Sequence, residues 1–234
     1  MFSRRNAIQS LAIASAASFS LATRAEQSCA VFNPTAQDAT SPDAAWKLLQ
    51  DGNDRFVEGR TLNCDLMKQV KDTTAKQSPF AVVVGCIDSR VPPELVFDQR
   101  IGDIFAARIA GNFVNTDILG SLEFATQLAG AKLVVVLGHT DCGAIKGAAD
   151  NAQLGNLTSL LANIRPSLEK LNYKGVASSK DKALVQKLAD QNAKDAVSKI
   201  LSKSEVIRNL ADSGKVKVVA AMHDLGTGKI SWFS

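Results

Sequence analysis

Two short motifs carry side chains that can do chemistry, and each one follows an apolar run and a glycine. The first motif places Cys86, Asp88 and Arg90 at alternate positions. The second places His139 three residues before Cys142, so that one loop offers an imidazole and a thiolate. Two thiolates and one imidazole suit zinc, and three protein ligands leave a fourth position for water or substrate, as in catalytic zinc sites. The two motifs together therefore predict a catalytic zinc site.

Asp88 has two available roles beside such a metal. It can take the fourth coordination position itself, or it can stay back and hold a metal-bound water in one orientation. Arg90 favours the second role, because a guanidinium matches a carboxylate with two parallel hydrogen bonds and keeps it off the metal. If that pair is broken, Asp88 is predicted to close the site. With the pair formed, zinc lowers the pKa of its bound water from about 15.7 to roughly 7, which supplies hydroxide near neutral pH.

Each of these residues, taken alone, has a simpler explanation. A cysteine after a strand is usually a small buried hydrophobe, and a single histidine is usually a hydrogen-bonded core residue. An Asp–Arg pair is usually a surface ion pair that contributes little to stability. The coincidence of both motifs, each behind a glycine, favours the zinc site over these separate explanations.

The elements that must position these motifs alternate along the chain. Apolar runs predict strands at 80–84, 104–109, 133–137 and 216–222. Helical patterns lie at 41–59, at 117–130, at 156–171 with a kink expected at Pro166, and at about 180–212. This alternation predicts an α/β fold, a single domain with a central, mostly parallel sheet flanked by helices. Ligands of such sheets bind beyond the carboxyl ends of the strands, where Cys86 and His139 are both expected.

The bulk composition is that of an ordinary soluble globular protein. The chain has 234 residues, of which 46% are hydrophobic and 21% are charged. No apolar stretch approaches the roughly 20 residues of a membrane-spanning helix, so we expect no membrane span. Loss of Arg4, Arg5 and Arg24 with an export signal lowers the formal charge from +4 to +1, which gives no ground for a nucleic-acid partner.

The first 25 residues resemble a twin-arginine export signal. Arg4 and Arg5 precede a mildly apolar run of small residues, and cleavage after Ala22 or Ala25 fits the pattern. An amphipathic first helix is the alternative, but the run has no clear helical stripe. We therefore expect the protein to be exported to the periplasm. Its predicted organisation is a signal peptide at 1–25, a flexible segment at 26–40 and a catalytic domain at 41–234.

The remaining cysteines, Cys29 and Cys64, lie in stretches without strand character. An oxidising compartment would allow them to form a disulfide. The sequence alone gives no distance between the two, and it leaves this pairing open.

At the two motifs the sequence resembles the β-class carbonic anhydrases, through 85–115 and 120–145 and more weakly to the end. The resemblance covers about residues 43–234. It implies one zinc ion per chain bound by Cys86, His139 and Cys142, and a dyad of Asp88 and Arg90. It also implies reversible hydration of carbon dioxide to bicarbonate and a proton. The small, uncharged substrate agrees with the absence of a phosphate-binding motif. A homodimer or an assembly of dimers is implied too, with the site near the subunit interface.

Some residues depart from the pattern of that family. Phe124 and His223 stand where many members have tyrosine, and Arg100 follows Gln99 where bacterial relatives often have glycine. We interpret His223 as structural and Gln99 as a polar group near the substrate.

Two other functions stay open at this point. An enzyme with the same site could hydrolyse carbon disulfide, as relatives of this fold do. A non-catalytic zinc or redox module would instead have Asp88 permanently in the fourth position, or a disulfide between Cys86 and Cys142.

Overall fold

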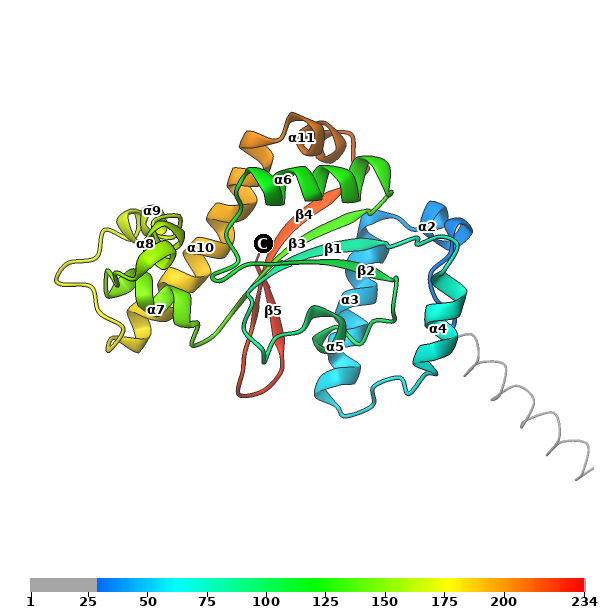
Figure 1. The fold of residues 1–234 in the computed structure, drawn as a ribbon, viewed down its shortest axis with the longest axis horizontal. Coiled ribbons are helices and arrows are strands. Elements are labelled where there is room, and N and C mark those ends of the chain that lie inside the picture. Colours follow the sequence, from blue (N-terminus) through cyan, green and yellow to red (C-terminus); the bar gives the residue numbers. More distant parts are fainter. Residues whose placement is uncertain (1–28, 234) are drawn as a thin grey trace, which may run out of the picture.

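The computed structural model describes residues 29–233, so the predicted signal peptide at 1–25 lies outside the described part of the chain. Residues 29–233 form a five-stranded sheet of order β2-β1-β3-β4-β5 (Figure 1). The first four strands in this order are parallel, and β5 pairs antiparallel with β4. The strands are β1 (Ala81–Gly85), β2 (Ile104–Arg108), β3 (Leu133–His139), β4 (Lys217–His223) and β5 (Ile230–Phe233). The predicted α/β domain with a mostly parallel sheet is confirmed.

Helices cover both faces of the sheet and one of its ends. One face packs on α3 and α5, the other on α6, α10 and α11, and α7 to α9 lie beyond the carboxyl ends of β1 and β3 (Figure 1). The helices before β3 are α2 (Pro34–Ala39), α3 (Pro42–Val57), α4 (Leu66–Thr73), α5 (Pro93–Val96) and α6 (Thr116–Glu123). Those after it are α7 (Gly143–Ala149), α8 (Gly155–Leu161), α9 (Arg165–Lys170), α10 (Lys182–Lys203) and α11 (Glu205–Asp212).

Local sequence explains where several helices begin and break. Ser41 caps α3 by accepting a hydrogen bond from the Ala44 amide, with proline at the first helical position. The helix predicted at 117–130 is α6, which continues into a π-helical turn, η1 (Phe124–Leu128). The segment 156–171 is two helices rather than one kinked helix, because Pro166 lies in the first turn of α9. The polar segment at 180–212 likewise divides at Ser204, which caps α11.

Residues 29–40, expected to be part of a flexible segment, pack on the domain instead. Cys29 and Cys64 form a disulfide. The Phe32 ring lies 4.8 Å from the Phe80 ring, next to the start of β1. Gln37 is buried and donates both amide hydrogen bonds to main-chain carbonyls of the domain. Because of these contacts, the folded domain begins before the predicted boundary at residue 41. Within the described range, none of the helices combines the length and the apolar character needed to span a bilayer.

Candidate metal centre

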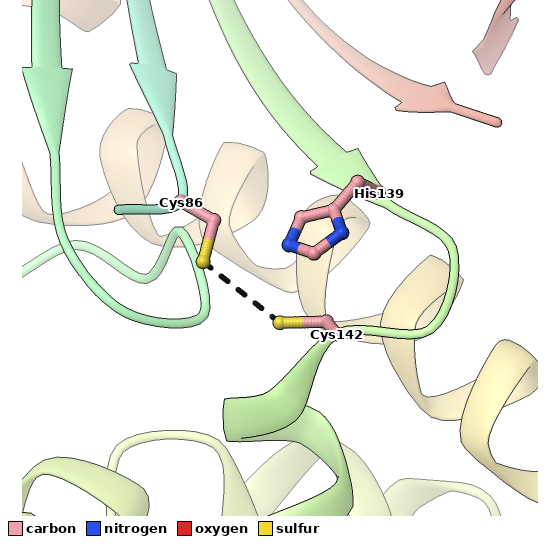
Figure 2. A group of neighbouring side chains, drawn as sticks. All are labelled: Cys86, His139 and Cys142. Atoms are coloured by element: carbon pink, nitrogen blue, oxygen red, sulfur yellow. Dashed lines mark hydrogen bonds between the residues drawn. The ribbon is translucent and has the colours of Figure 1, made fainter. Parts of the chain in front are cut away.

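The two sequence motifs meet at the carboxyl ends of β1 and β3, which are neighbouring parallel strands. Cys86 follows β1 directly, and His139 is the last residue of β3. Cys142 occupies the N-cap position of α7 after a short turn. All three side chains converge on one space between the strand ends (Figure 2). The two loops, which are about fifty residues apart in sequence, therefore converge as predicted.

The three donor atoms are close together and shielded from solvent. The sulfur, nitrogen and sulfur atoms all lie within 4.8 Å of one another. The two sulfurs, of Cys86 and Cys142, are 3.9 Å apart, and the three residues are at most 4% exposed. Such distances between donors fit a single ion at the ligand distances of a transition metal.

The His139 ring supplies the clearest evidence that the cluster is built for a cation. Its Nδ1 lies 2.9 Å from the Thr140 carbonyl oxygen, so this nitrogen carries the proton and donates. Its Nε2 is buried and has no hydrogen-bond partner among the described residues. A buried acceptor without a partner is costly, and metal-binding histidines commonly orient the ring by donating from the other nitrogen. The residues present therefore fit a metal ion.

The two thiols are in hydrogen-bond contact with each other. This contact lowers the pKa of the Cys86 thiol, although burial opposes the shift. The pKa of Cys142 is raised, first because its proton is bonded to the Cys86 sulfur and then because the group is buried. Replacing that proton by a divalent cation would let both sulfurs be thiolates.

Backbone donors and one arginine hold Cys86 in place. The Gly111 amide donates to the Cys86 sulfur at 3.3 Å. Arg108, the last residue of β2, donates from Nε to the Cys86 carbonyl at 2.9 Å and from Nη2 to the Asp88 carbonyl at 2.5 Å. Arg108 is not among the residues predicted from the sequence. The signal available was a single charged residue at the end of an apolar run, facing the end of a neighbouring strand.

Asp88 is clamped by Arg90 beside the three donors. Arg90 donates from Nε to Oδ1 at 2.9 Å and from Nη2 to Oδ2 at 2.7 Å, and its amide also donates to Oδ1 at 3.0 Å. These bonds hold the pKa of Asp88 well below its usual range. Asp88 Oδ2 lies 3.8 Å from His139 Nε2. The carboxylate is thus ionised and stands at the edge of the cluster.

The other residues singled out from the sequence lie elsewhere or border the cluster. Gln99 donates to the Phe97 carbonyl at 2.5 Å and lies beside Gly52 of α3, so its role near the substrate stays a prediction. His223 is in register with His139 on β4 and is buried, and this burial lowers its pKa. Phe124 is half exposed at the start of η1.

Comparison with known proteins places this site in a family. A family profile described as "Carbonic anhydrase" matches residues 81–230. The chain is 33% identical to "Carbonic anhydrase 2" of Mycobacterium tuberculosis over 81% of this chain and 92% of that one. A solved structure, one of "two tetrameric beta-carbonic anhydrases" from Sordaria macrospora, superposes with a TM-score of 0.60. Its sequence identity is 26%, covering 69% of this chain and 83% of that chain. The chain belongs to the β-class carbonic anhydrases.

The resemblance seen in the sequence is confirmed by these matches. A further relative, "Carbonic anhydrase" of Mycolicibacterium smegmatis, is 34% identical over 82% of this chain and 93% of the relative. The three donors, Asp88 and Arg90 all lie inside the profile match.

Proposed function

We propose that this carbonic anhydrase hydrates carbon dioxide reversibly to bicarbonate and a proton, at one zinc ion held by Cys86, His139 and Cys142. One observation carries the proposal. Two thiol sulfurs and an unpartnered imidazole nitrogen lie within 4.8 Å of one another, buried, beside an ionised carboxylate. Two thiolates and one neutral imidazole are a zinc donor set that leaves a fourth position free.

When bound, zinc supplies the Lewis acidity that brings the pKa of a coordinated water to about 7. The protein's first contribution to the reaction is the charge of its metal ligands. Two thiolates balance the charge of the cation, so the environment around the nucleophile has to be set by neighbouring groups. Asp88 and Arg90 are charged side chains beside the cluster that can do so.

We infer that Asp88 orients the attacking oxygen by accepting its proton in a hydrogen bond. An ionised carboxylate has about four acceptor positions, two on each oxygen. Arg90 occupies both positions of Oδ1 and one of Oδ2. One acceptor position therefore remains on Oδ2, the oxygen that lies nearest the His139 ring nitrogen. Arg90 at the same time keeps Asp88 from becoming a ligand itself.

The test combines metal analysis with stopped-flow carbon dioxide hydration on the same purified sample. We expect one zinc per chain, loss of activity on chelation and recovery when zinc is returned. A fully zinc-loaded protein that hydrates carbon dioxide no faster than buffer would refute the proposal.

We also propose that the protein is exported, as the twin-arginine pattern at residues 4 and 5 predicts. The Cys29–Cys64 disulfide supports an oxidising compartment, because disulfides are rare in cytosolic proteins. A twin-arginine route carries folded proteins, so zinc could be bound by Cys86 and Cys142 before those thiols meet oxidants. Cell fractionation with and without Arg4→Lys and Arg5→Lys tests this. Unchanged export of the double variant would refute the twin-arginine route.

We further propose that two copies associate through the β2–α6 face, which we define by Phe105 of β2, Ile118 of α6, and Phe124 and Leu128 of η1. Strand β2 is an edge of the sheet, and a hollow of about 800 Å³ lies between it and α6. Phe124 is 50% exposed and Leu128 is 76% exposed. An apolar face of this kind beside a free strand edge is typical of a subunit interface.

A further inference from the structure

The two backbone polar groups of Gly111 connect the metal centre to helix α10. The Gly111 amide donates to the Cys86 sulfur at 3.3 Å. The Gly111 carbonyl accepts a hydrogen bond from the Asn192 side-chain amide at 2.8 Å. Asn192 lies in α10, 81 residues away along the chain, and is only 3% exposed. A single glycine is therefore held by Asn192 on one side and directs its N–H at a sulfur ligand on the other.

The backbone at Gly111 adopts a conformation that needs such support. Gly111 has φ +79° and Asn112 has φ +42°, so two consecutive residues lie in the left-handed region. A Cβ at residue 111 would come within 2.6 Å of Ile164 Cδ1 and 3.2 Å of Ala144 Cβ, so a side chain there would force these neighbours to move and would also be strained at this φ. Glycine adopts a positive φ without strain, but a left-handed non-glycine residue such as Asn112 is strained, and such residues persist where surrounding contacts fix them, often at functional sites. The bond from Asn192 is one such contact, and it acts at the residue that donates to the sulfur.

The second sulfur is placed differently. Cys142 is the N-cap residue of α7, and its side chain accepts no capping hydrogen bond from that helix. The Gly111 donor to Cys86 comes from a separate loop and depends on a remote side chain.

We propose that Asn192 is a positioning residue that sets the donor strength of the Cys86 thiolate through Gly111. An N–H bonded to a thiolate withdraws charge from the sulfur, so the sulfur gives less charge to its metal and the metal stays a stronger Lewis acid. This inference rests on the proposed metal site. It assigns to a buried amide on α10 an electronic role in addition to packing.

The experiment replaces zinc by cobalt and follows the thiolate-to-cobalt charge-transfer band. Asn192→Leu keeps the side-chain volume but removes the donor. We expect its band to move to longer wavelength, because sulfur lone pairs that lose a hydrogen bond rise in energy. Loss of such an outer partner is also expected to lower kcat/KM of the zinc enzyme by about 10- to 100-fold. Ile200→Ala is the matched control, since Ile200 is buried in the same helix but packs on the sheet. It should lower thermal stability without moving the band.

A second measurement needs no variant. In wild-type protein loaded with cadmium-113, the Gly111 amide proton should show scalar coupling to the metal through the hydrogen bond to sulfur. An unshifted band in folded, cobalt-loaded Asn192→Leu, or absence of that coupling in the wild type, overturns this inference alone. Wild-type protein that binds no cobalt overturns the proposed function, and this inference with it.

Discussion

Asp88 and Arg90 are joined by two side-chain hydrogen bonds, from Nε to Oδ1 at 2.9 Å and from Nη2 to Oδ2 at 2.7 Å. The same Oδ2 lies 3.8 Å from His139 Nε2, so the arginine holds this carboxylate beside one of the three donor atoms. Arg90 is about half exposed, and an exposed ion pair of this kind contributes little to stability. The main effect of this ion pair is therefore to position the Asp88 carboxylate.

Replacing the carboxylate by an amide should separate metal binding from turnover. Asp88→Asn is expected to keep a full complement of zinc, because Cys86, His139 and Cys142 are unchanged. Its kcat/KM should fall by about 10- to 100-fold or more, since the amide presents donors as well as an acceptor and the nucleophile loses its orientation. Zinc analysis and stopped-flow hydration on the same sample measure both quantities. Full activity in the zinc-loaded variant would show that Asp88 does not orient the nucleophile.

Removing the arginine should let Asp88 reach the metal. In Arg90→Ala the carboxylate loses its clamp, and we expect it to fill the fourth coordination position. X-ray absorption on the zinc protein at neutral pH would then show a carboxylate ligand, and anions would no longer bind. The double variant Arg90→Ala with Asp88→Asn is the control, because it removes both the clamp and the competing ligand and should bind anions again. A fourth site that stays accessible in Arg90→Ala contradicts the clamp.

The ligand cluster could be predicted from the sequence because its placement follows from sheet geometry alone. Buried runs before Cys86 and His139 predict parallel strands, and the carboxyl ends of neighbouring parallel strands meet. The contacts of Arg108 and Asn192 could not be found this way. Those of Arg108 reach main-chain carbonyls beyond the end of the neighbouring strand, and that of Asn192 depends on the left-handed backbone at Gly111 and on the packing of α10. None of these features leaves a periodic pattern.

The ends of the fold were also hard to predict, for a related reason. Strand β5 has four residues and pairs antiparallel at the edge of the sheet, so it carries no long apolar run. Residues 29–40 are polar enough to read as flexible, yet the disulfide and the side chain of Gln37 anchor them. Where the local sequence pattern is weak, tertiary contacts of this kind determine whether a segment packs on the domain.

The disulfide should matter for stability and little for catalysis. It joins two residues that are 35 apart in sequence. The neighbouring Phe32 packs on Phe80 at the start of β1, whereas the metal cluster lies at the other end of that strand. Cys29→Ser with Cys64→Ser is expected to lower the free energy of unfolding by about 2–5 kcal/mol, because the unfolded chain regains its freedom. Urea denaturation of the zinc-loaded protein measures this, and kcat/KM should stay close to that of the wild type. Equal stability of variant and wild type would mean that the bond does not constrain the chain.

The β2–α6 face offers a test of assembly. Phe124→Asp places a charge on an exposed aromatic side chain of this face, and burying that charge between two copies would be costly. We expect sedimentation velocity to show a shift from dimer to monomer. Val176→Asp is the matched control, because Val176 is 93% exposed and lies outside the face. A Phe124→Asp protein that sediments like the wild type would place the interface elsewhere.

Asp195 provides a pH-dependent test away from the metal. Burial raises the pKa of this carboxyl, but hydrogen bonds from Lys170, Ser167 and Gln191 outweigh it, so the net pKa is below its usual value. A lowered folded-state pKa stabilises the protein above the unfolded value of about 3.9, and this contribution is lost as the pH falls through the folded pKa.

The stability difference between wild type and Asp195→Asn should therefore be constant from about pH 7 to about pH 5 and shrink below about pH 4. Urea denaturation across that range measures it, and any acid loss of metal affects both proteins alike and cancels in the difference. Asp190→Asn is the control on the same helix, because Asp190 accepts a hydrogen bond from the neutral side chain of Gln186. A difference that grows on acidification would mean that the Lys170–Asp195 pair between α9 and α10 is not what lowers this pKa.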